Sequence, residues 1–310
     1  MKHTIFHTVC VTVLLCFCTY KVLGIRLAEQ KCQDYRKTIA ALSPAPAMAS
    51  RTNEFVTPSN GLPAMDGEFP HQVLVGQWFY EDEDDTAFIM RCSGALISDQ
   101  YVLVSGHCFW ALAGDEVSLG RHDYTRNSSF PELLIKRGSL IMFPGFDELT
   151  VASYNDIGLI RLEESVTFSS HVYPICLWTD DKPLDLSHLI STGFRMGKQV
   201  NDTQDTQLMK LRMRRVPNED CTQVYAGNKY FPQGVSDKQL CVEAPVDWKS
   251  TCEGDVGELL QTVEKGSVHG AYRLIGLEGK GVDCDEVHRK IVFTKIDKYL
   301  DWIESVVWKS

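Results

Sequence analysis

Three short segments of the chain carry the residue types that could do nucleophilic or acid–base chemistry. The segment LVSGHCFW places His107 beside Cys108, and YNDIGLIRL opens an apolar run with Asp156. A histidine held by a carboxylate is a common general base for activating a nucleophile. The third segment, TCEGDVGELL, leads through a cysteine, a glycine and an acid to a turn where a nucleophile would be exposed. That position holds Val256, whose side chain has no hydroxyl, thiol or lone pair.

The elements that must position these segments are short and β-rich from about residue 68 onward. Runs such as HQVLVGQWF, ALISDQYVLVS and DIGLIRL are separated by Gly, Asn, Asp and Pro. Regular short strands without intervening helices predict an all-β barrel or sandwich. Near the end of the chain, Ile296, Leu300, Ile303 and Val307 recur at helical spacing, which predicts an amphipathic C-terminal helix packed on the body.

Residues 1–24 have the pattern of a secretory signal peptide. Lys2 precedes an apolar run, VTVLLCFC, that is too short to span a bilayer, and Val22-Leu23-Gly24 is a small-residue cleavage pattern. No later stretch is long and apolar enough to span, so we expect a secreted, extracellular chain. Loss of Lys2 and Lys21 would change the formal net charge from −10 to −12, and so acidic a chain is a poor candidate for binding nucleic acid.

The segment 25–61 is polar and rich in alanine and proline, and it contains one cysteine. We expect a light N-terminal extension rather than a folded domain, followed by one unit over residues 62–308. Three of the 11 cysteines lie in the signal peptide, and the other eight predict four disulfides in a secreted chain. Counting alone cannot pair them. No CxxC or HExxH spacing occurs, so we predict no metal site and no cofactor.

The order and spacing of the three segments resemble the chymotrypsin/trypsin-type serine protease family, whose triad runs His, Asp, Ser along the chain. The resemblance covers roughly residues 62–305. It also includes GEFPHQV (67–73), CSGALIS (92–98), YPICL (173–177) and the final YLDWI (299–303). Each motif is weak alone, but together and in order they are specific. They imply two antiparallel six-stranded β-barrels, about 62–175 and 190–295, with a C-terminal helix and a cleft between the barrels.

The N-terminal extension resembles that of arthropod clotting and immune proteases of the snake-like type. Those proteases keep a light chain tied by a disulfide to the cysteine of a PxCL motif, which implies a pairing of Cys32 with Cys176 here. The family pattern implies the other three disulfides, Cys92–Cys108, Cys221–Cys241 and Cys252–Cys284. All eight cysteines are then used.

The resemblance also assigns roles to the three chemical segments. In the family a serine attacks the scissile carbonyl, a histidine takes its proton and a buried aspartate orients the histidine. His107 and Asp156 match the base and the orienter, whereas Val256 stands where the serine should be. Without the nucleophile only ~10³–10⁴-fold acceleration over water remains. We therefore expect His107 and Asp156 to persist as a buried hydrogen-bonded pair rather than as a catalytic one.

The activation switch departs from the family as well. Family members are cleaved after a basic residue, and the new Ile-Val-Gly-Gly amine pairs with the acid before the nucleophile, here Asp255. The corresponding residues are Pro58–Gly61, and Thr57 precedes them instead of a basic residue. After the turn, Glu258 replaces a glycine, which would disturb its packing.

The specificity pocket departs in the same direction. Its base corresponds to Ser250, and a glycine that leaves room for substrate corresponds to Ile291. We expect the side chain of Ile291 to fill the pocket. The Ser-Trp-Gly edge strand that binds substrate backbone is absent, and GLEGKGVDC (276–284) occupies its region.

Several other sequence features are interpreted as surface or structural features and not as catalytic or metal sites. EDEDD (81–85) is expected to be a solvated hairpin tip rather than a calcium loop, because ligand spacing and a turn glycine are missing. Lys210, Arg212, Arg214 and Arg215 alternate with apolar residues, so they predict the outward face of a strand in preference to a site for anionic glycans. Two sequons in predicted loops favour glycosylation at Asn127 and Asn201. The remaining histidines show no ligand spacing: His71, His122, His171, His188, His269 and His288.

Together these patterns predict a secreted serine protease homologue that acts by binding, as a cofactor, decoy or regulator in an extracellular proteolytic or immune cascade. Its partners would be extracellular proteins, such as cascade proteases or their substrates. One alternative is an active secreted trypsin-like endopeptidase, although neither Ser250 nor Ser267 matches the nucleophile turn. The other is a protein that recognises glycans or microbial surfaces.

Overall fold

The computed structural model of the chain describes residues 25–42, 61–82, 85–111, 116–122, 133–179, 188–194, 207–245, 258–264, 272–279 and 289–309. All structural statements concern these residues. Several predicted features lie outside them: the signal peptide, the activation residues before Gly61, both sequons (Asn127 and Asn201), Ser250, Asp255, Val256, Ser267 and the Cys252–Cys284 pair.

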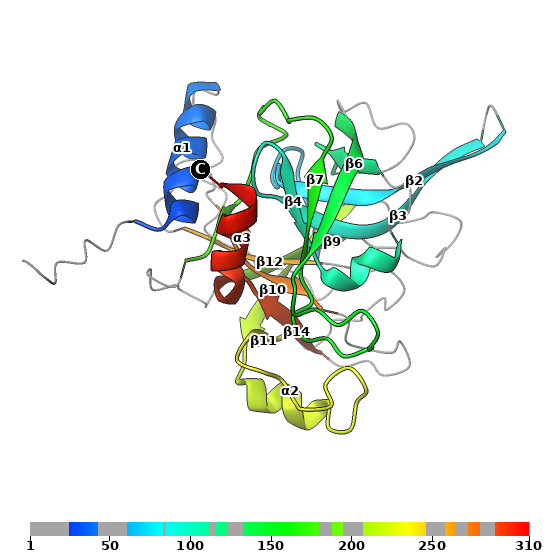
Figure 1. Ribbon diagram of the computed structural model, residues 1–310, viewed down its shortest axis with the longest axis vertical. Helices are drawn as coiled ribbons and strands as arrows, with labels where there is room; N and C mark the ends of the chain where they lie inside the picture. The colour runs from blue at the N-terminus through cyan, green and yellow to red at the C-terminus, as the bar shows by residue number, and fades with distance from the viewer. Residues whose placement is uncertain are drawn as a thin grey trace, which may run out of the picture.

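The predicted all-β architecture of two barrels is confirmed (Figure 1). The first barrel closes in the order β2-β3-β4-β7-β6-β5, and every neighbouring pair in it is antiparallel. Its strands are β2 (Gln72–Asp82), β3 (Asp85–Leu96), β4 (Tyr101–Val104), β5 (Glu116–Leu119), β6 (Leu133–Met142) and β7 (Gly158–Leu162).

The second barrel follows the order β9-β10-β11-β14-β13-β12 and closes where β12 pairs with β9. Its strands are β9 (Leu189–Phe194), β10 (Leu208–Arg215), β11 (Gln239–Glu243), β12 (Leu259–Val263), β13 (Tyr272–Glu278) and β14 (Lys290–Lys295). Two short strands add to it: β1 (Leu62–Pro63) pairs with β10, and β8 (Cys176–Leu177) pairs in parallel with β13.

Few helical elements accompany the barrels. They are α1 (Leu27–Leu42), the 3₁₀ turn η2 (Gly106–Ala111), α2 (Asn218–Val224), the 3₁₀ turn η3 (Ile296–Tyr299) and α3 (Leu300–Val307). The predicted C-terminal helix is therefore present, and its apolar stripe faces inward because Ile296, Leu300 and Ile303 are almost fully buried. None of the described helices has the length and apolar character that crossing a membrane requires.

Because successive side chains point to opposite faces of a strand, β2 contributes residues to two hydrophobic cores. On β2, Val73 and Val75 pack into the interior of the first barrel, while Leu74 between them packs on the opposite side. That opposite side joins a core built from both barrels and from α3. Because both faces of the strand are buried, its register is strongly specified.

A buried polar chain joins the same two barrels. His71 Nε2 lies 2.8 Å from Gln261 Oε1, the amide of Gln261 donates to Thr192 Oγ1 at 2.7 Å, and that hydroxyl donates to Gln72 Oε1 at 2.9 Å. Burial lowers the pKa of His71 to about 3, although the Gln261 contact opposes that shift. His71 is therefore a neutral structural residue.

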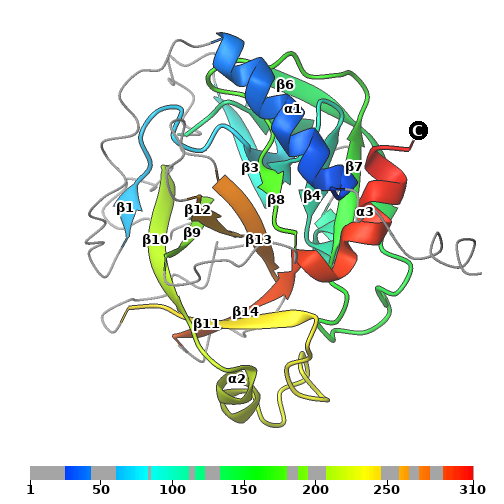
Figure 2. The ribbon, with the colours of Figure 1, turned by 90° about the vertical axis from the view of Figure 1, so that its left-hand side faces the viewer.

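The N-terminal extension contains a helix that the sequence pattern did not predict. The 16 residues of α1 lie across the body beside α3 (Figure 2). The predicted disulfide joins Cys32 to Cys176, and Ala28 and Ile39 are buried. The other described pairings, Cys92–Cys108 and Cys221–Cys241, are also confirmed.

Charged contacts hold α1 in addition to the disulfide. Glu29 Oε2 lies 2.8 Å from Arg273 Nη2, and both side chains are about 97 % buried or more. Arg26 pairs with Glu304 of α3 at 3.1 Å. The extension is therefore docked through α1 rather than tethered only by its cysteine.

One sequence prediction about the second barrel is wrong. Lys210 does not lie on the outward face of β10: its side chain is 5 % exposed, and its ammonium contacts both carboxylate oxygens of Glu68 at 2.6 and 2.8 Å. The strand carries a run of consecutive buried residues at 210 and 211, so strict alternation fails there. Arg212 and Arg214 do face outward as predicted.

Candidate functional site

The site is centred on His107, which lies in η2 directly after β4. The Cys92–Cys108 disulfide joins η2 to β3, so the backbone beside His107 is fixed to the first barrel. The side chain of His107 is 15 % exposed. One edge of its ring is thus accessible from solvent.

Asp156 holds the other edge of that ring. Asp156 is fully buried just before β7, and its Oδ2 lies 2.8 Å from His107 Nδ1. Its Oδ1 accepts a hydrogen bond from the backbone N–H of His107 at 2.6 Å. A proton on Nδ1 pointing at the carboxylate leaves Nε2 as the free acceptor, which is the orientation a general base needs. The hydrogen bonds expected between the two residues are therefore present, with Asp156 buried and His107 partly exposed.

Glycine and a strained turn allow this close approach. A Cβ on Gly106 would lie 3.1 Å from Asp156 Oδ1 and 3.0 Å from the backbone nitrogen of Ile157. Asn155, just before the carboxylate, has a φ of 53°, a left-handed conformation that asparagine tolerates better than most residues. Its Oδ1 accepts from the Tyr299 hydroxyl at 3.1 Å.

Tyr299 completes the buried side of the carboxylate. Burial raises the pKa of Tyr299, and the negative charges of Asp156 and Asp237 act in the same direction. Its ring packs edge-on against Phe143 with centroids 5.0 Å apart. This surrounding keeps Asp156 away from solvent.

The end of β13 closes against the pair. Gly279 lies so near that a Cβ on it would be 2.6 Å from Ser153 Oγ and 3.6 Å from Asp156 Oδ2. Ser105 Oγ donates to the carbonyl of Glu278 at 2.7 Å. In the pairing of β13 with β14, Leu277 lies opposite Thr294 and Glu278 opposite Phe293. The strand end that follows thus packs directly on the groups around Asp156.

The nucleophile turn itself, with Val256 and Asp255, lies outside the described residues, but the chain after it is described. Glu258 does not point into solvent: its carboxylate accepts a hydrogen bond from Ser191, and its Cγ would lie 2.8 Å from a Cβ on Gly193. Its carbonyl accepts from the backbone of Glu278 at 2.9 Å. Glu258 is therefore built into the contact between β9 and the end of β13.

Ile291 is placed on β14 with its side chain 7 % exposed. It belongs to an apolar cluster with Met213, Val242 and Phe293. Ser250, the predicted base of the pocket, lies outside the described residues, so the filled pocket remains a prediction.

Metal binding has little support among the residues described. The one group there with suitable spacing is Cys92, His107 and Cys108. The two cysteines form a disulfide with each other, so neither offers the thiolate that a metal needs.

Comparison with known proteins agrees with this fold. The family profile for trypsin matches residues 59–303. The protein therefore belongs to the trypsin family of serine proteases.

Three individual relatives share 28 % or less of their aligned residues with this chain. Serine protease snk of Drosophila melanogaster is 28 % identical over 298 residues, which cover 93 % of this chain and 67 % of that protein. Serine protease Hayan of the same species is 26 % identical over 79 % of this chain, but only 38 % of its own length is covered. Trypsin-1 of Astacus astacus is 26 % identical, with 98 % of its length covered.

Proposed function

We propose that this chain is a secreted trypsin-family protein that lacks peptidase activity and acts by binding extracellular proteins, as a cofactor, decoy or regulator in a proteolytic cascade. The observation that carries the proposal is Val256, which stands in the family's nucleophile position in the segment TCEGDVGELL. An alkyl side chain can neither attack a carbonyl nor give a proton to His107. The signal-peptide pattern and the three disulfides support secretion.

Two further contacts support the loss of activity. The end of β13, where the family binds substrate backbone, packs against Ser153 and Asp156. Glu258 occupies the space beside Gly193 that a glycine would leave open.

A second candidate is an active secreted endopeptidase. The hydrogen-bonded His107–Asp156 pair favours it, because that pair has the geometry of a general base and its orienter. The two candidates differ in whether any serine of this chain is reactive.

A fluorophosphonate probe that labels activated serines separates them. Purified protein would be treated with the probe before and after nicking with trypsin, and the adduct located by mass spectrometry. We expect no labelled serine in either form, with trypsin itself as the positive control. Labelling that disappears in a His107→Ala variant would establish the active enzyme instead.

Restoring the nucleophile is a second test. We expect Val256→Ser to give no turnover of tripeptide amide substrates, because the activation residues and the pocket residue Ile291 stay changed. Adding Ile291→Gly and a cleavable Arg-Ile-Val-Gly-Gly sequence in place of Thr57–Gly61 should be needed before any activity is measured. Turnover by the single variant would contradict the assigned roles of Ile291 and Pro58.

A further inference from the structure

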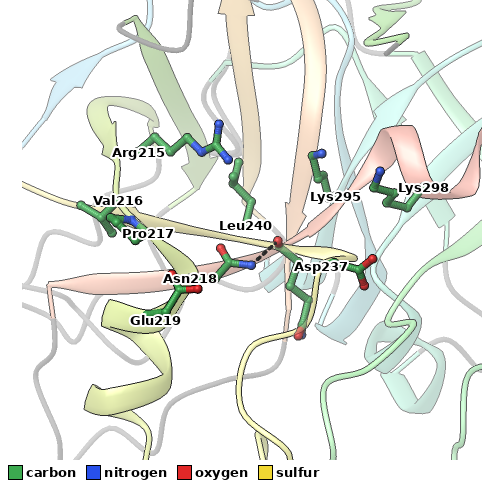
Figure 3. A pocket seen from close by; sticks show the side chains of 10 residues that line it. Arg215, Val216, Pro217, Asn218, Glu219, Asp237, Leu240, Lys295 and Lys298 are labelled. Carbon is green, nitrogen blue, oxygen red and sulfur yellow. Dashed lines mark hydrogen bonds between the residues drawn. The ribbon is translucent and has the colours of Figure 1, made fainter.

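A cavity lies beside α2, between the ends of β10 and β14 (Figure 3). Its volume is about 700 Å³, which lies within the usual range of small-ligand sites. Its lining does not include His107 or Asp156. The proposed function does not require this cavity, so the identity of its ligand is argued independently of that function.

Three cations from three elements line one side of this cavity: Arg215 of β10, Lys295 of β14 and Lys298 of η3. Their nitrogen ends lie along the same side in Figure 3. Among the residues the structure describes, Arg215 forms no ion pair. Its guanidinium therefore keeps its donors for a ligand.

The two lysines are held in place from behind. Asp297 has a fully buried side chain, and its Oδ2 lies 2.9 Å from Lys295 Nζ and 3.5 Å from Lys298 Nζ. Lys295 Nζ also lies 4.9 Å from the ring centroid of Trp178. One carboxylate shared by two ammonium groups leaves each lysine with further donors.

The opposite side of the cavity carries acceptors. Glu219 and Asp237 are both exposed, and within the described ranges neither carboxylate is ion-paired. Val216, Pro217 and Leu240 supply apolar surface between the two sides. The cavity thus offers donors for an anion, acceptors for hydroxyl groups and an apolar floor.

We propose that this cavity binds a sulfated sugar unit. The sulfate ester would lie against Arg215, Lys295 and Lys298, because charge-assisted bonds to an oxyanion are the strongest available there. Ring hydroxyls would donate to Glu219 and Asp237, and the C–H face of the ring would cover the apolar floor. A single unit fits better than a long polyanion, because the chain has a net charge of −10 and the cavity contains its own carboxylates.

Calorimetric titration with N-acetylglucosamine 6-sulfate tests the proposal on the whole mature chain. We expect saturable binding with a dissociation constant on the order of 0.1–1 mM, the affinity usual for a ligand of this size. N-acetylglucosamine and inorganic sulfate, each alone at matched ionic strength, should bind at least about tenfold more weakly. Arg215→Gln and Lys298→Gln should each weaken binding of the sulfated sugar by about tenfold.

Variants of the two acidic lining residues distinguish a site for a sulfated sugar from a site for sulfate alone. Asp237→Asn and Glu219→Gln should weaken the sulfated sugar and leave inorganic sulfate unchanged or tighter. Arg161→Gln, an exposed arginine on β7 in the other barrel, is the matched control and should change nothing. Thermal unfolding of each variant checks that the fold is intact.

Two outcomes would overturn the proposal. One is the absence of saturable binding by the sulfated sugar. The other is equal binding of inorganic sulfate with no effect of the Asp237 and Glu219 variants, which would reduce the cavity to a simple oxyanion site. Neither outcome depends on whether the chain cleaves peptides, so this test and the probe-labelling test can fail independently.

Discussion

Asp156 has a structural task that does not depend on catalysis. It is buried and accepts two hydrogen bonds from His107, one from the ring and one from the backbone. In a protein without a nucleophile, selection for folding alone is a sufficient reason to retain both residues. The contribution of the His107–Asp156 pair to stability and its role in catalysis must therefore be tested in separate experiments.

We predict that Asp156→Ala lowers the free energy of unfolding by roughly 2–4 kcal/mol, because it leaves a buried N–H without an acceptor and creates a cavity. His107→Ala should cost less, since its ring is partly exposed and the backbone bond survives. Urea unfolding monitored by tryptophan fluorescence gives both values. Equal, small effects would mean that the carboxylate is not a structural acceptor.

His71 gives a prediction about pH. Its pKa is about 3 in the folded protein and about 6.5 when unfolded, so below pH 6.5 the unfolded chain binds a proton that the folded chain does not. Stability is therefore fully present above pH 6.5 and falls as the pH drops towards 3. We expect a loss of roughly 3 kcal/mol between pH 7 and pH 4 from this residue.

A non-titrating variant isolates that contribution. His71→Gln should be less stable than the natural protein at pH 7 but should lose less stability on acidification. Ser165→Ala, at an exposed position without an ionisable side chain, serves as the control with an unchanged pH profile. If His71→Gln and the natural protein lose stability in parallel down to pH 4, His71 is not buried in its neutral form.

At the scale of elements, β10 and the segment that precedes β2 are held together by a buried charge pair. Glu68 accepts from the backbone N–H of Met65 as well as from Lys210. The carboxylate of Glu68 is therefore held by a bond besides the ion pair, and such additional hydrogen bonds help a protein to tolerate a buried ion pair.

We predict that Lys210→Met lowers the free energy of unfolding by about 3–5 kcal/mol, because the carboxylate of Glu68 would be left buried without its cation. Replacing both residues, as Lys210→Met with Glu68→Leu, should recover a large part of that loss. Arg212→Met, two residues along the same strand and exposed, should change stability by under about 1 kcal/mol. Denaturant unfolding of the three variants decides, and a double variant no better than Lys210→Met would refute the pairing argument.

The docked helix α1 gives a second prediction at this scale. Arg273 is buried between Glu29 and Glu264 and donates to the carbonyl of Leu177 at 2.9 Å. Glu29→Ala should loosen α1, with faster amide exchange over residues 27–42 and a lower melting temperature, because Arg273 loses a buried partner. Lys37→Ala, exposed on the same helix, should leave exchange unchanged.

How far the sequence predicts each element depends on the range of the contacts that fix it. The all-β character of the chain and α3 were predicted because apolar residues recur at strand or helix spacing within a few positions, whereas the division into two barrels was implied by the family resemblance. Helix α1 was missed because LAEQKCQDYRKTIAAL has no strong apolar stripe, and its burial comes from partners on β13 and α3. Burial of Lys210 was missed for the same reason, since Glu68 lies 142 positions away.

Across the whole molecule, the two candidate sites also differ in whether the sequence predicts them. The His107–Asp156 pair was predicted through its resemblance to a family with the same segments in the same order. The cavity beside α2 has no such signature, since its three cations come from β10, β14 and η3. Of the basic run noted in the sequence, Arg215 faces the cavity, whereas Arg214 pairs with Glu243.

The disulfide that joins the extension to the body gives the prediction for the molecule as a whole. Cys32 and Cys176 are 144 positions apart, so the chain-entropy model assigns their bond about 4–5 kcal/mol. A Cys32→Ser/Cys176→Ser variant should melt at a lower temperature yet keep α1 protected from amide exchange, because the Glu29–Arg273 and Arg26–Glu304 contacts remain. Complete loss of protection over residues 27–42 would show that the covalent bond alone holds the helix.

Those contacts also bring the two ends of the described chain together. Arg26 meets Glu304, and the indole of Trp308 donates to the hydroxyl of Tyr35 at 2.9 Å. A short linker from residue 309 to residue 25 could therefore make the backbone continuous without moving either helix. Such a circularly permuted protein, opened at an exposed turn such as Ala226–Gly227, would keep every contact of α1, but β11–β14 of the second barrel would be synthesised before the first barrel and β9 and β10 after it.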